Sequence, residues 1–170
     1  ALVGTGVVLG TSPQLPVAAA TPASATLLVT GTAGFANSAV GDSGLEGWGV
    51  DTTLVSSTRW TVFESSASNL VANDTNNASD IFVTNGTTIT RLSVSASGAE
   101  GSVSANSFDP TICGTGRKVV FTTENEWDEV DANGAEDVYV IDRDADANGV
   151  MDEFSRTGGV TTSIVSVSYN

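Results

Sequence analysis

The chain carries one short apolar stretch twice, as Asp80-Ile81-Phe82-Val83 and as Asp137-Val138-Tyr139-Val140. Each copy follows a turn with the pattern Asp-x-Asn-x-x-x-Asp, at residues 74–80 and 131–137. A pattern that recurs at fixed spacing indicates an internal structural repeat. This repeat constrains the fold more strongly than any single segment does.

The match extends outward in both directions. Residues 51–63 lie over 109–121, and residues 87–95 lie over 160–168. Each copy holds four short runs rich in β-branched residues and bounded by Gly, Asn, Asp and Ser, a pattern typical of strands and turns. The expected strands lie near Leu54, at 60–65, 81–83 and 89–95, and then near Ile112, at 118–123, 138–141 and 160–168.

Four strands in a unit of this length are typical of a propeller blade. We therefore predict an all-β fold with two antiparallel four-stranded propeller blades, at residues 28–100 and 101–170. Two blades cannot close a ring, because propellers have about four or more. The expectation is an incomplete propeller or part of an assembled ring, whose open edges are covered by further blades, other copies or the N-terminal segment.

Three blocks of the second copy carry a family resemblance. In order, Asp109-Pro110-Thr111-Ile112, residues 115–121 and Asp137-Val138-Tyr139-Val140 resemble the repeat of TolB-like β-propellers. The resemblance is to a secreted bacterial or archaeal type with a calcium-loop insertion, covers roughly residue 30 to the end, and implies a propeller fold. The turn usually written Asp-Gly is Thr115-Gly116 here and Ser57-Thr58 in the first copy. WD-type repeats match less well, since a chain without histidine has no Gly-His pair.

Oxygen-bearing side chains alternate along residues 142–153, which belong to an insertion at 142–158 that the first copy lacks. Calcium prefers about six to eight oxygen ligands, and alternation lets a short segment point several of them at one centre. The sequence therefore predicts a Ca²⁺ loop, with a solvated acidic loop as the competing interpretation. The predicted ligands are Asp142, Asp144, Asp146, Asn148, the carbonyl of Val150, Asp152 and Glu153.

Two registers of this loop compete. A loop that starts at Asp144 places Gly149 at the sharp turn but puts Ser155 where a bidentate acid is usual. A loop that starts at Asp142 puts Glu153 in that twelfth place but has Ala147 at the turn. We favour the first register because the turn needs the backbone freedom of glycine. In it, Asp152 or Glu153 closes the coordination shell.

The repeated turns allow two interpretations. Asx side chains commonly bond their own backbone in turns, but the same spacing could also hold a second cation. The residues concerned are Asp74, Asn76 and Asp80 in the first copy and Asp131, Asn133 and Asp137 in the second. Asp51 and Asp109 also match between copies, and for them we expect a hydrogen bond to the backbone of a neighbouring blade.

The aromatic residues divide into two groups. Trp60, Phe63 and Phe121 fall on the apolar pattern of the expected strands and are predicted to lie in the core. Trp48 and Trp127 fall outside this pattern, so either is a candidate surface contact.

Composition excludes several classes of function. The net charge is −14, with 20 acidic and 6 basic residues, which disfavours nucleic-acid binding. The acidity fits either cation binding or adaptation to high salt. Without histidine and with a single cysteine, the chain has no Ser-His-Asp or Cys-His site, no usual zinc site and no internal disulfide. Paired carboxylates can hydrolyse glycosides, but nothing singles out a catalytic pair, so we expect a non-catalytic protein.

Residues 1–41 contain no charged side chain. Residues 1–27 resemble the later part of a secretory signal, or form an extended segment able to pair with an open sheet edge. Glycines and prolines interrupt the apolar run, so no transmembrane span is predicted. The expected function is a calcium-binding propeller repeat protein, secreted or at the cell surface, that binds a protein or itself through open sheet edges. Alternatives are the propeller portion of a larger secreted peptidase or glycosidase, and a structural subunit assembling by edge-strand donation.

Overall fold

The structure is a computed structural model that describes residues 30–31, 34–35, 50–127 and 133–166. Within these residues it contains ten β-strands and no helix, which confirms the all-β prediction. Eight of the strands form two four-stranded sheets. The remaining two form a small antiparallel pair, β1 (Thr30–Gly31) and β2 (Gly34–Phe35).

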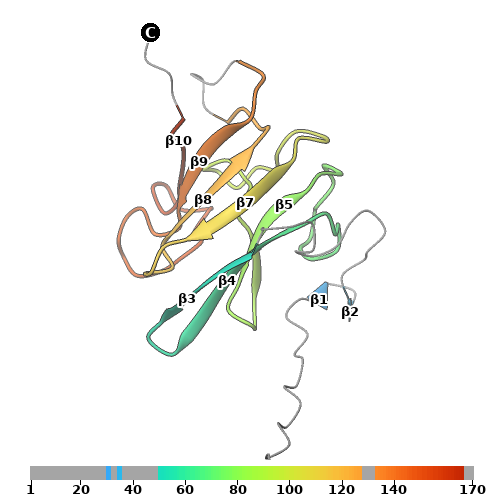
Figure 1. Ribbon diagram of the computed structural model, residues 1–170. Coiled ribbons are helices and arrows are strands. Elements are labelled where there is room, and N and C mark those ends of the chain that lie inside the picture. The colour runs from blue at the N-terminus through green and yellow to red at the C-terminus, as the bar shows by residue number, and fades with distance from the viewer. Residues whose placement is uncertain (1–29, 32–33, 36–49, 128–132, 167–170) are drawn as a thin grey trace, which may run out of the picture.

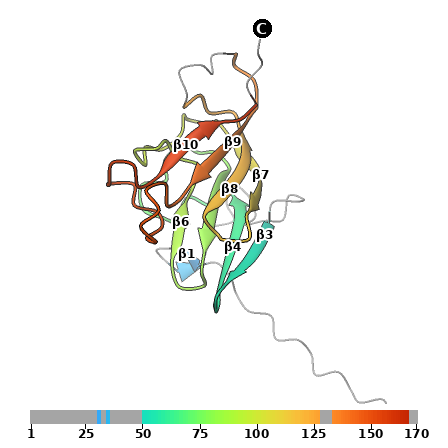
Figure 2. The same ribbon diagram turned by 90° about the vertical axis from the view of Figure 1, so that its left-hand side faces the viewer.

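In each large sheet, every strand pairs antiparallel with the next strand of the chain. Sheet 1 consists of β3 (Val50–Val55), β4 (Thr58–Ser65), β5 (Asp80–Thr84) and β6 (Ile89–Arg91). Sheet 2 consists of β7 (Ser107–Ile112), β8 (Lys118–Thr123), β9 (Asp137–Asp142) and β10 (Thr161–Ile164). Strand β7 lies against β3, β4 and β5, at the boundary between the sheets (Figures 1 and 2).

The registers of the two central strands of each sheet agree with the sequence repeat. Val62 faces Val83 across β4 and β5, and their counterparts Val120 and Val140 face each other across β8 and β9. In the same way Phe63 faces Phe82, and Phe121 faces Tyr139. The repeat found in the sequence is therefore a repeat of structure, with equivalent side chains on equivalent faces.

The first strands of the two sheets differ, because β7 contains a bulge between Phe108 and Thr111 that β3 lacks. Asp109 within the bulge has a φ of 53°, and Pro110 has no N–H to give to a neighbouring strand.

The last strands, β6 and β10, are shorter than predicted. After β6 the hydroxyl of Ser93 accepts the N–H of Ile81, at 3.0 Å, in place of a backbone carbonyl. After β10 the hydroxyl of Ser166 accepts the N–H of Val138 in the same way, at 2.9 Å. A side chain therefore takes over the ladder hydrogen bond at the same point of both copies, which ends the regular pairing.

Because side chains alternate across a strand, each sheet has two distinct faces. Sheet 1 has an aliphatic face, formed by Val62, Ile81 and Val83, and an aromatic face, formed by Phe63 and Phe82. Sheet 2 has the corresponding face, formed by Val120, Val138 and Val140 with Phe108 of β7 on the same side, and an aromatic face, formed by Phe121 and Tyr139.

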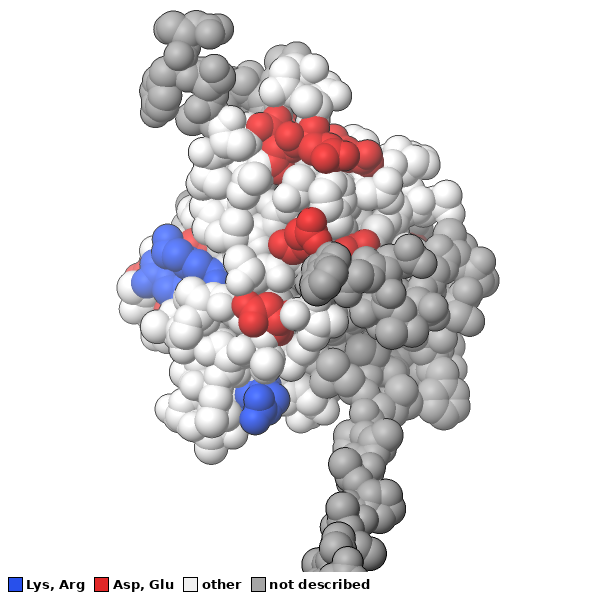
Figure 3. Space-filling view, in the orientation of Figure 1, with Lys and Arg blue, Asp and Glu red and all other residues white. Residues whose placement is uncertain are grey.

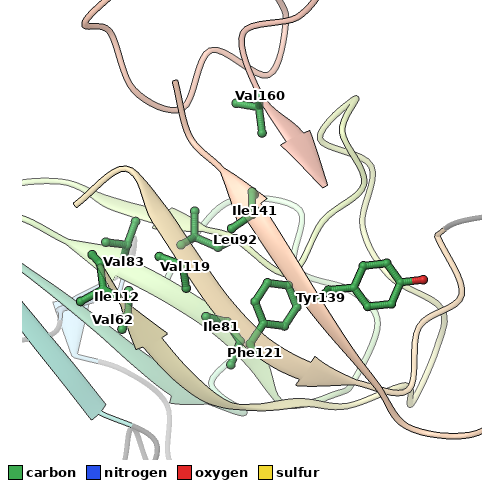
Figure 4. Packing of buried hydrophobic residues seen from close by; sticks show 10 residues of the cluster. All are labelled: Val62, Ile81, Val83, Leu92, Ile112, Val119, Phe121, Tyr139, Ile141 and Val160. Carbon is green, nitrogen blue, oxygen red and sulfur yellow. The ribbon is translucent and has the colours of Figure 1, made fainter. Parts of the chain in front are cut away.

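The main core lies between the aliphatic face of sheet 1 and the aromatic face of sheet 2 (Figure 4). Trp127 packs edge-on against both Phe121 and Tyr139, with ring centroids 6.2 and 5.5 Å apart. Trp127 is thus packed against the core and is not the surface contact that the sequence suggested, whereas Trp48 lies outside the described residues. The cluster's buried members are Val62, Ile81, Val83, Leu92, Ile112, Val119, Phe121, Tyr139, Ile141 and Val160.

A second cluster covers the aromatic face of sheet 1. Phe63 and Phe82 stack with centroids 5.7 Å apart, and Ala67 and Leu70 pack against them. The predicted core positions of Phe63 and Phe121 are therefore confirmed, while Trp60 is only partly buried beside the main core.

Hydrogen bonds at the rim fix how the sheets meet. The carboxylate of Asp51 on β3 accepts the backbone N–H of Ile112 and the hydroxyl of Thr111, both at 2.8 Å. The expected bond to the neighbouring unit's backbone is confirmed for Asp51, whereas the exposed carboxylate of Asp109 makes no hydrogen bond within the described residues. Partial burial raises the pKa of Asp51, but the bonds from Ile112 and Thr111 outweigh it and lower the pKa below its usual value.

A matched pair of substitutions tests the core. Val119 is 0% exposed in the core and Val165 is 52% exposed after β10. Val119→Ala removes two buried methyl groups and leaves a cavity, so we expect it to lower the free energy of unfolding by about 2 kcal/mol. Val165→Ala is expected to change it by less than about 0.5 kcal/mol. Urea unfolding measures both, and equal losses would contradict the described core.

Candidate metal-binding loop and charge clusters

The predicted calcium loop leaves sheet 2 at the end of β9 and returns at the start of β10 (Figure 1). Its first residue, Asp142, pairs with two consecutive cations at the start of the neighbouring strand β8, namely Arg117, just before it, and Lys118. Arg117 donates to both Asp142 oxygens at 2.6 and 2.9 Å, and Lys118 lies 3.2 Å away. The bonds from Arg117 outweigh burial and lower the pKa of Asp142 to about 2. Asp142 therefore anchors the loop to the sheet.

Arg143 is the buried anchor of the loop, and its side chain is 0% exposed. Its guanidinium donates to both oxygens of Asp152, at 2.8 and 2.6 Å, and to the carbonyl of Gly116 at 2.7 Å. It also lies 4.4 Å from the ring centre of Trp60, a cation–π contact that reaches sheet 1. Asp152 is thus bound to Arg143 and does not join the other predicted ligands.

Three other acids of the loop gather around Asn148. The side-chain amide of Asn148 donates to Asp146 at 3.0 Å and to Glu153 at 2.7 Å. Its backbone N–H donates to Asp144 at 2.9 Å. Asp146 also pairs with Arg156, at 2.6 Å. Of the predicted side-chain ligands, Asp144, Asp146, Asn148 and Glu153 therefore lie together, whereas Asp142 and Asp152 lie apart from them.

The backbone at the tip of the loop is left-handed at two places. Gly149 has a φ of 87° and Ala147 a φ of 56°. The Gly149 conformation agrees with the register that starts at Asp144, because it costs glycine little. Val150 is exposed, and its N–H donates to the side-chain oxygen of Asn148 at 2.7 Å.

Within the part of the chain that the structure describes, no three acidic or cysteine side chains lie close enough together to hold a metal ion. The loop carboxylates instead share the amide of Asn148 and the guanidinium of Arg156. Their chemistry nevertheless fits calcium, which takes oxygen ligands only.

The repeated Asx turns form the same network in both copies. Asn76 donates to Asp80 at 3.1 Å and accepts the N–H of Ala78 at 3.2 Å. In the second copy Asn133 donates to Asp137 at 3.2 Å and accepts the N–H of Ala135 at 2.7 Å. These contacts are the ones expected if the Asx side chains stabilise turns and do not bind a cation.

Each turn is also tied to the end of the sheet. The hydroxyl of Ser93 donates to Asp80, and that of Ser166 donates to Asp137. Ser93 and Ser166 are equivalent in the sequence repeat, but the sequence alone indicates no role for them. Asp131 lies outside the described residues.

The first copy adds a guanidinium to this network. Arg91 places one nitrogen 3.2 Å from Asp74, 3.4 Å from Asp80 and 2.8 Å from Glu100. A protein cation thus occupies the site where the second interpretation placed a metal ion. In the second copy the equivalent position is Ile164.

Three carboxylates around one guanidinium leave excess negative charge. Burial and the nearby charge of Asp80 raise the pKa of Asp74 to about 6. Burial also raises the pKa of Glu100, but hydrogen bonds from Thr75 and Arg91 outweigh it and lower the pKa to about 2. Burial raises the pKa of Asp80 as well, so Asp74 and Asp80 take up protons at higher pH than Glu100 does.

Comparisons with protein-family models, with curated proteins and with solved structures found no match for this chain. Among the residues that the structure describes, no helix has the length and apolar character to cross a membrane. On the face shown in Figure 3, acidic side chains form several separate patches, and the visible basic ones occupy two small areas.

Removing the carboxylate of Asp152 tests the anchor. Asp152→Ala leaves the guanidinium of Arg143 buried without its partner, so we expect a loss of about 3 kcal/mol in unfolding free energy. Asp146→Ala is the matched control, because its partner Arg156 is 55% exposed, and exposed pairs contribute less than about 1 kcal/mol. Urea unfolding in chelator measures both. Equal losses of unfolding free energy in the two variants would contradict the role of Asp152 as the carboxylate that compensates the buried charge of Arg143.

The charge of Asp74 makes stability depend on pH. The pKa of Asp74 in the folded protein, about 6, lies above its ordinary value of 3.8. The favourable contribution of Asp74 to the free energy of unfolding is therefore complete below pH 3.8 and is lost as pH rises through 6, because the buried carboxyl group then becomes charged. Asp74→Asn removes that charge and is expected to raise stability by about 1 kcal/mol at pH 8, but not at pH 4. The exposed Asp109→Asn serves as control and should show no such difference. A gain of equal size at both pH values would contradict the assignment.

Proposed function

We propose that this protein is a secreted or cell-surface, non-catalytic module of propeller-type repeats that binds calcium through the loop of its second repeat and acts in binding or assembly. The observation that carries the proposal is the gathering of Asp144, Asp146 and Glu153 around Asn148. The two meander sheets support the repeat assignment, because each has the strand order of a blade and one packs its face on the next.

The geometry divides the predicted ligands into two roles. Asp144, Asp146, Asn148 and Glu153 hold the ion in this proposal. Asp142 and Asp152 instead hold the base of the loop through Arg117 and Arg143, so ion binding does not have to break these buried contacts. The loop base is thus ordered before the ion arrives, which reduces the entropy lost on binding.

A binding or assembly role agrees with the chemistry of the chain. It has no histidine, and many of its described acids already hold backbone groups, arginines or asparagines. The outer strands β3, β6 and β10 leave sheet edges open within the described residues, whereas on β7 the N–H groups of Ser107 and Ile112 already donate to Ser79 and Asp51. Open edges offer unpaired backbone groups to another strand, which is how sheets commonly associate.

Calorimetric titration of chelator-treated protein with Ca²⁺ tests the loop. We expect one site, with Mg²⁺ binding more weakly because it demands near-octahedral geometry. Asp146→Asn removes a ligand charge and should weaken Ca²⁺ binding at least about tenfold, whereas Glu136→Gln, an exposed acid outside the loop, should not. At ten times the dissociation constant, Ca²⁺ should raise the unfolding free energy by about 1.4 kcal/mol. Absence of binding at millimolar Ca²⁺ would remove calcium from the proposal.

A further inference from the structure

The hairpin that joins β5 and β6 ends in a turn built around the side chain of Asn85. The side-chain oxygen of Asn85 accepts the backbone N–H groups of Thr87 and Thr88, both at 2.9 Å, and the hydroxyl of Thr88 at 3.1 Å. Gly86 follows Asn85 in a left-handed conformation, with a φ of 86°. All three donors meet the oxygen of the side-chain amide, so the turn does not use its nitrogen.

The amide nitrogen of Asn85 makes no hydrogen bond to any residue that the structure describes, and the same holds for Asn73 and Asn77. Asn73 and Asn77 are exposed, and Asn85 is half-buried. Other asparagines of the described chain donate from this nitrogen to a carboxylate or a backbone carbonyl, namely Asn76, Asn106, Asn125, Asn133 and Asn148.

The asparagines with an unused amide nitrogen share a sequence motif. Asn73, Asn77 and Asn85 each begin an Asn-x-Ser/Thr triplet, at residues 73–75, 77–79 and 85–87, whereas none of the asparagines that donate from this nitrogen does. The triplet, with any residue but proline in the middle, is the acceptor motif for N-linked glycans in secreted proteins. The sugar is attached to the amide nitrogen, so motif and structure select the same side chains.

The third residue of the triplet distinguishes Asn85 from the other two. Thr75 and Ser79 already donate their hydroxyls to glutamate carboxylates, at 2.7 and 2.9 Å. Thr87 is exposed, and its hydroxyl makes no hydrogen bond to any described residue. Among the described residues, the triplet at 85–87 alone presents both an unused amide nitrogen and an unused hydroxyl.

Building on the secreted location proposed above, we propose that Asn85 is an N-glycosylation site. In the reaction, the amide nitrogen of Asn85 forms a bond to the anomeric carbon of an oligosaccharide carried on a lipid diphosphate. The bond from that carbon to the diphosphate oxygen breaks, the lipid diphosphate leaves with the electron pair, and the amide nitrogen loses one proton. The product keeps the side-chain oxygen of Asn85, so the hydrogen bonds of the turn remain.

The surroundings of the turn have room for a glycan. A Cβ added at Gly86 would meet no atom within 4 Å, and Gly86, Thr87 and Thr88 are all exposed. The turn lies at one end of β6, an outer strand of sheet 1. A glycan there places a bulky hydrophilic group beside this edge, which opposes pairing of β6 with another sheet. Assembly through open edges is then directed to β3 or β10.

Secretion of the 170-residue chain from a host that N-glycosylates its proteins, behind the host's own leader, tests the site. Enzymatic release of the glycan converts the modified asparagine to aspartate, and peptide mass spectrometry locates this change, which we expect at Asn85. Thr87→Ala removes the required hydroxyl and leaves the contacts of the turn in place, so it should lower the modified fraction at Asn85 at least about tenfold. Thr87→Ser keeps a hydroxyl and is the matched control that should stay modified.

Two results would overturn the proposal. The first is an unmodified Asn85 in the secreted chain, including the case in which Asn73 or Asn77 carries a glycan and Asn85 does not. The second is modification of Asn85 that persists in Thr87→Ala, because the glycan would then not depend on the triplet.

The host's leader imposes secretion and the measurement involves no calcium, so a negative result removes this site alone. A failed calcium titration leaves the site unaffected. The proposed location is tested separately, by fractionating the cells that naturally produce the chain.

Discussion

The contact between two unlike sheet faces is what holds the described molecule together. A four-stranded meander buries few side chains by itself, so most of its stability comes from covering one apolar face. Here the aliphatic face of sheet 1 is covered by the aromatic face of sheet 2, and small branched side chains meet large flat ones. Polar contacts at the rim, such as Asp51 to Ile112, then select one way of placing one sheet on the other.

The few cations of the chain are placed where this contact and the turns require them. Five of the six basic residues form ion pairs within the described part of the chain. Arg143 joins the loop to Trp60 of the other sheet, and Arg91 binds the turn of the first repeat to its last strand. In a protein of net charge −14, each such cation also reduces the repulsion among neighbouring carboxylates.

Self-comparison of the sequence predicted the strands and their grouping into two antiparallel four-stranded units, because a repeat shows its period directly in the spacing of apolar residues. It also predicted the bond from Asp51 to the neighbouring sheet. It could not predict that Arg143 binds Asp152, since that pair depends on how the loop folds back and has no characteristic spacing. For the same reason Asp142 and Asp152 could not be separated from Asp144, Asp146 and Glu153 in the sequence alone. The prediction for Trp127 was wrong because this residue follows β8 and lies outside the alternating pattern of that strand. It nevertheless packs against Phe121 of the same strand.

The covered aromatic face of sheet 1 makes the two sheets unequal. Phe63 and Phe82 are buried beneath Ala67 and Leu70, and the opposite face of the same sheet is buried against sheet 2. On sheet 2, by contrast, Val120, Val138 and Val140 are only partly buried. Sheet 1 is therefore the interior layer of the described structure, and its backbone amides should be the slowest to exchange with solvent.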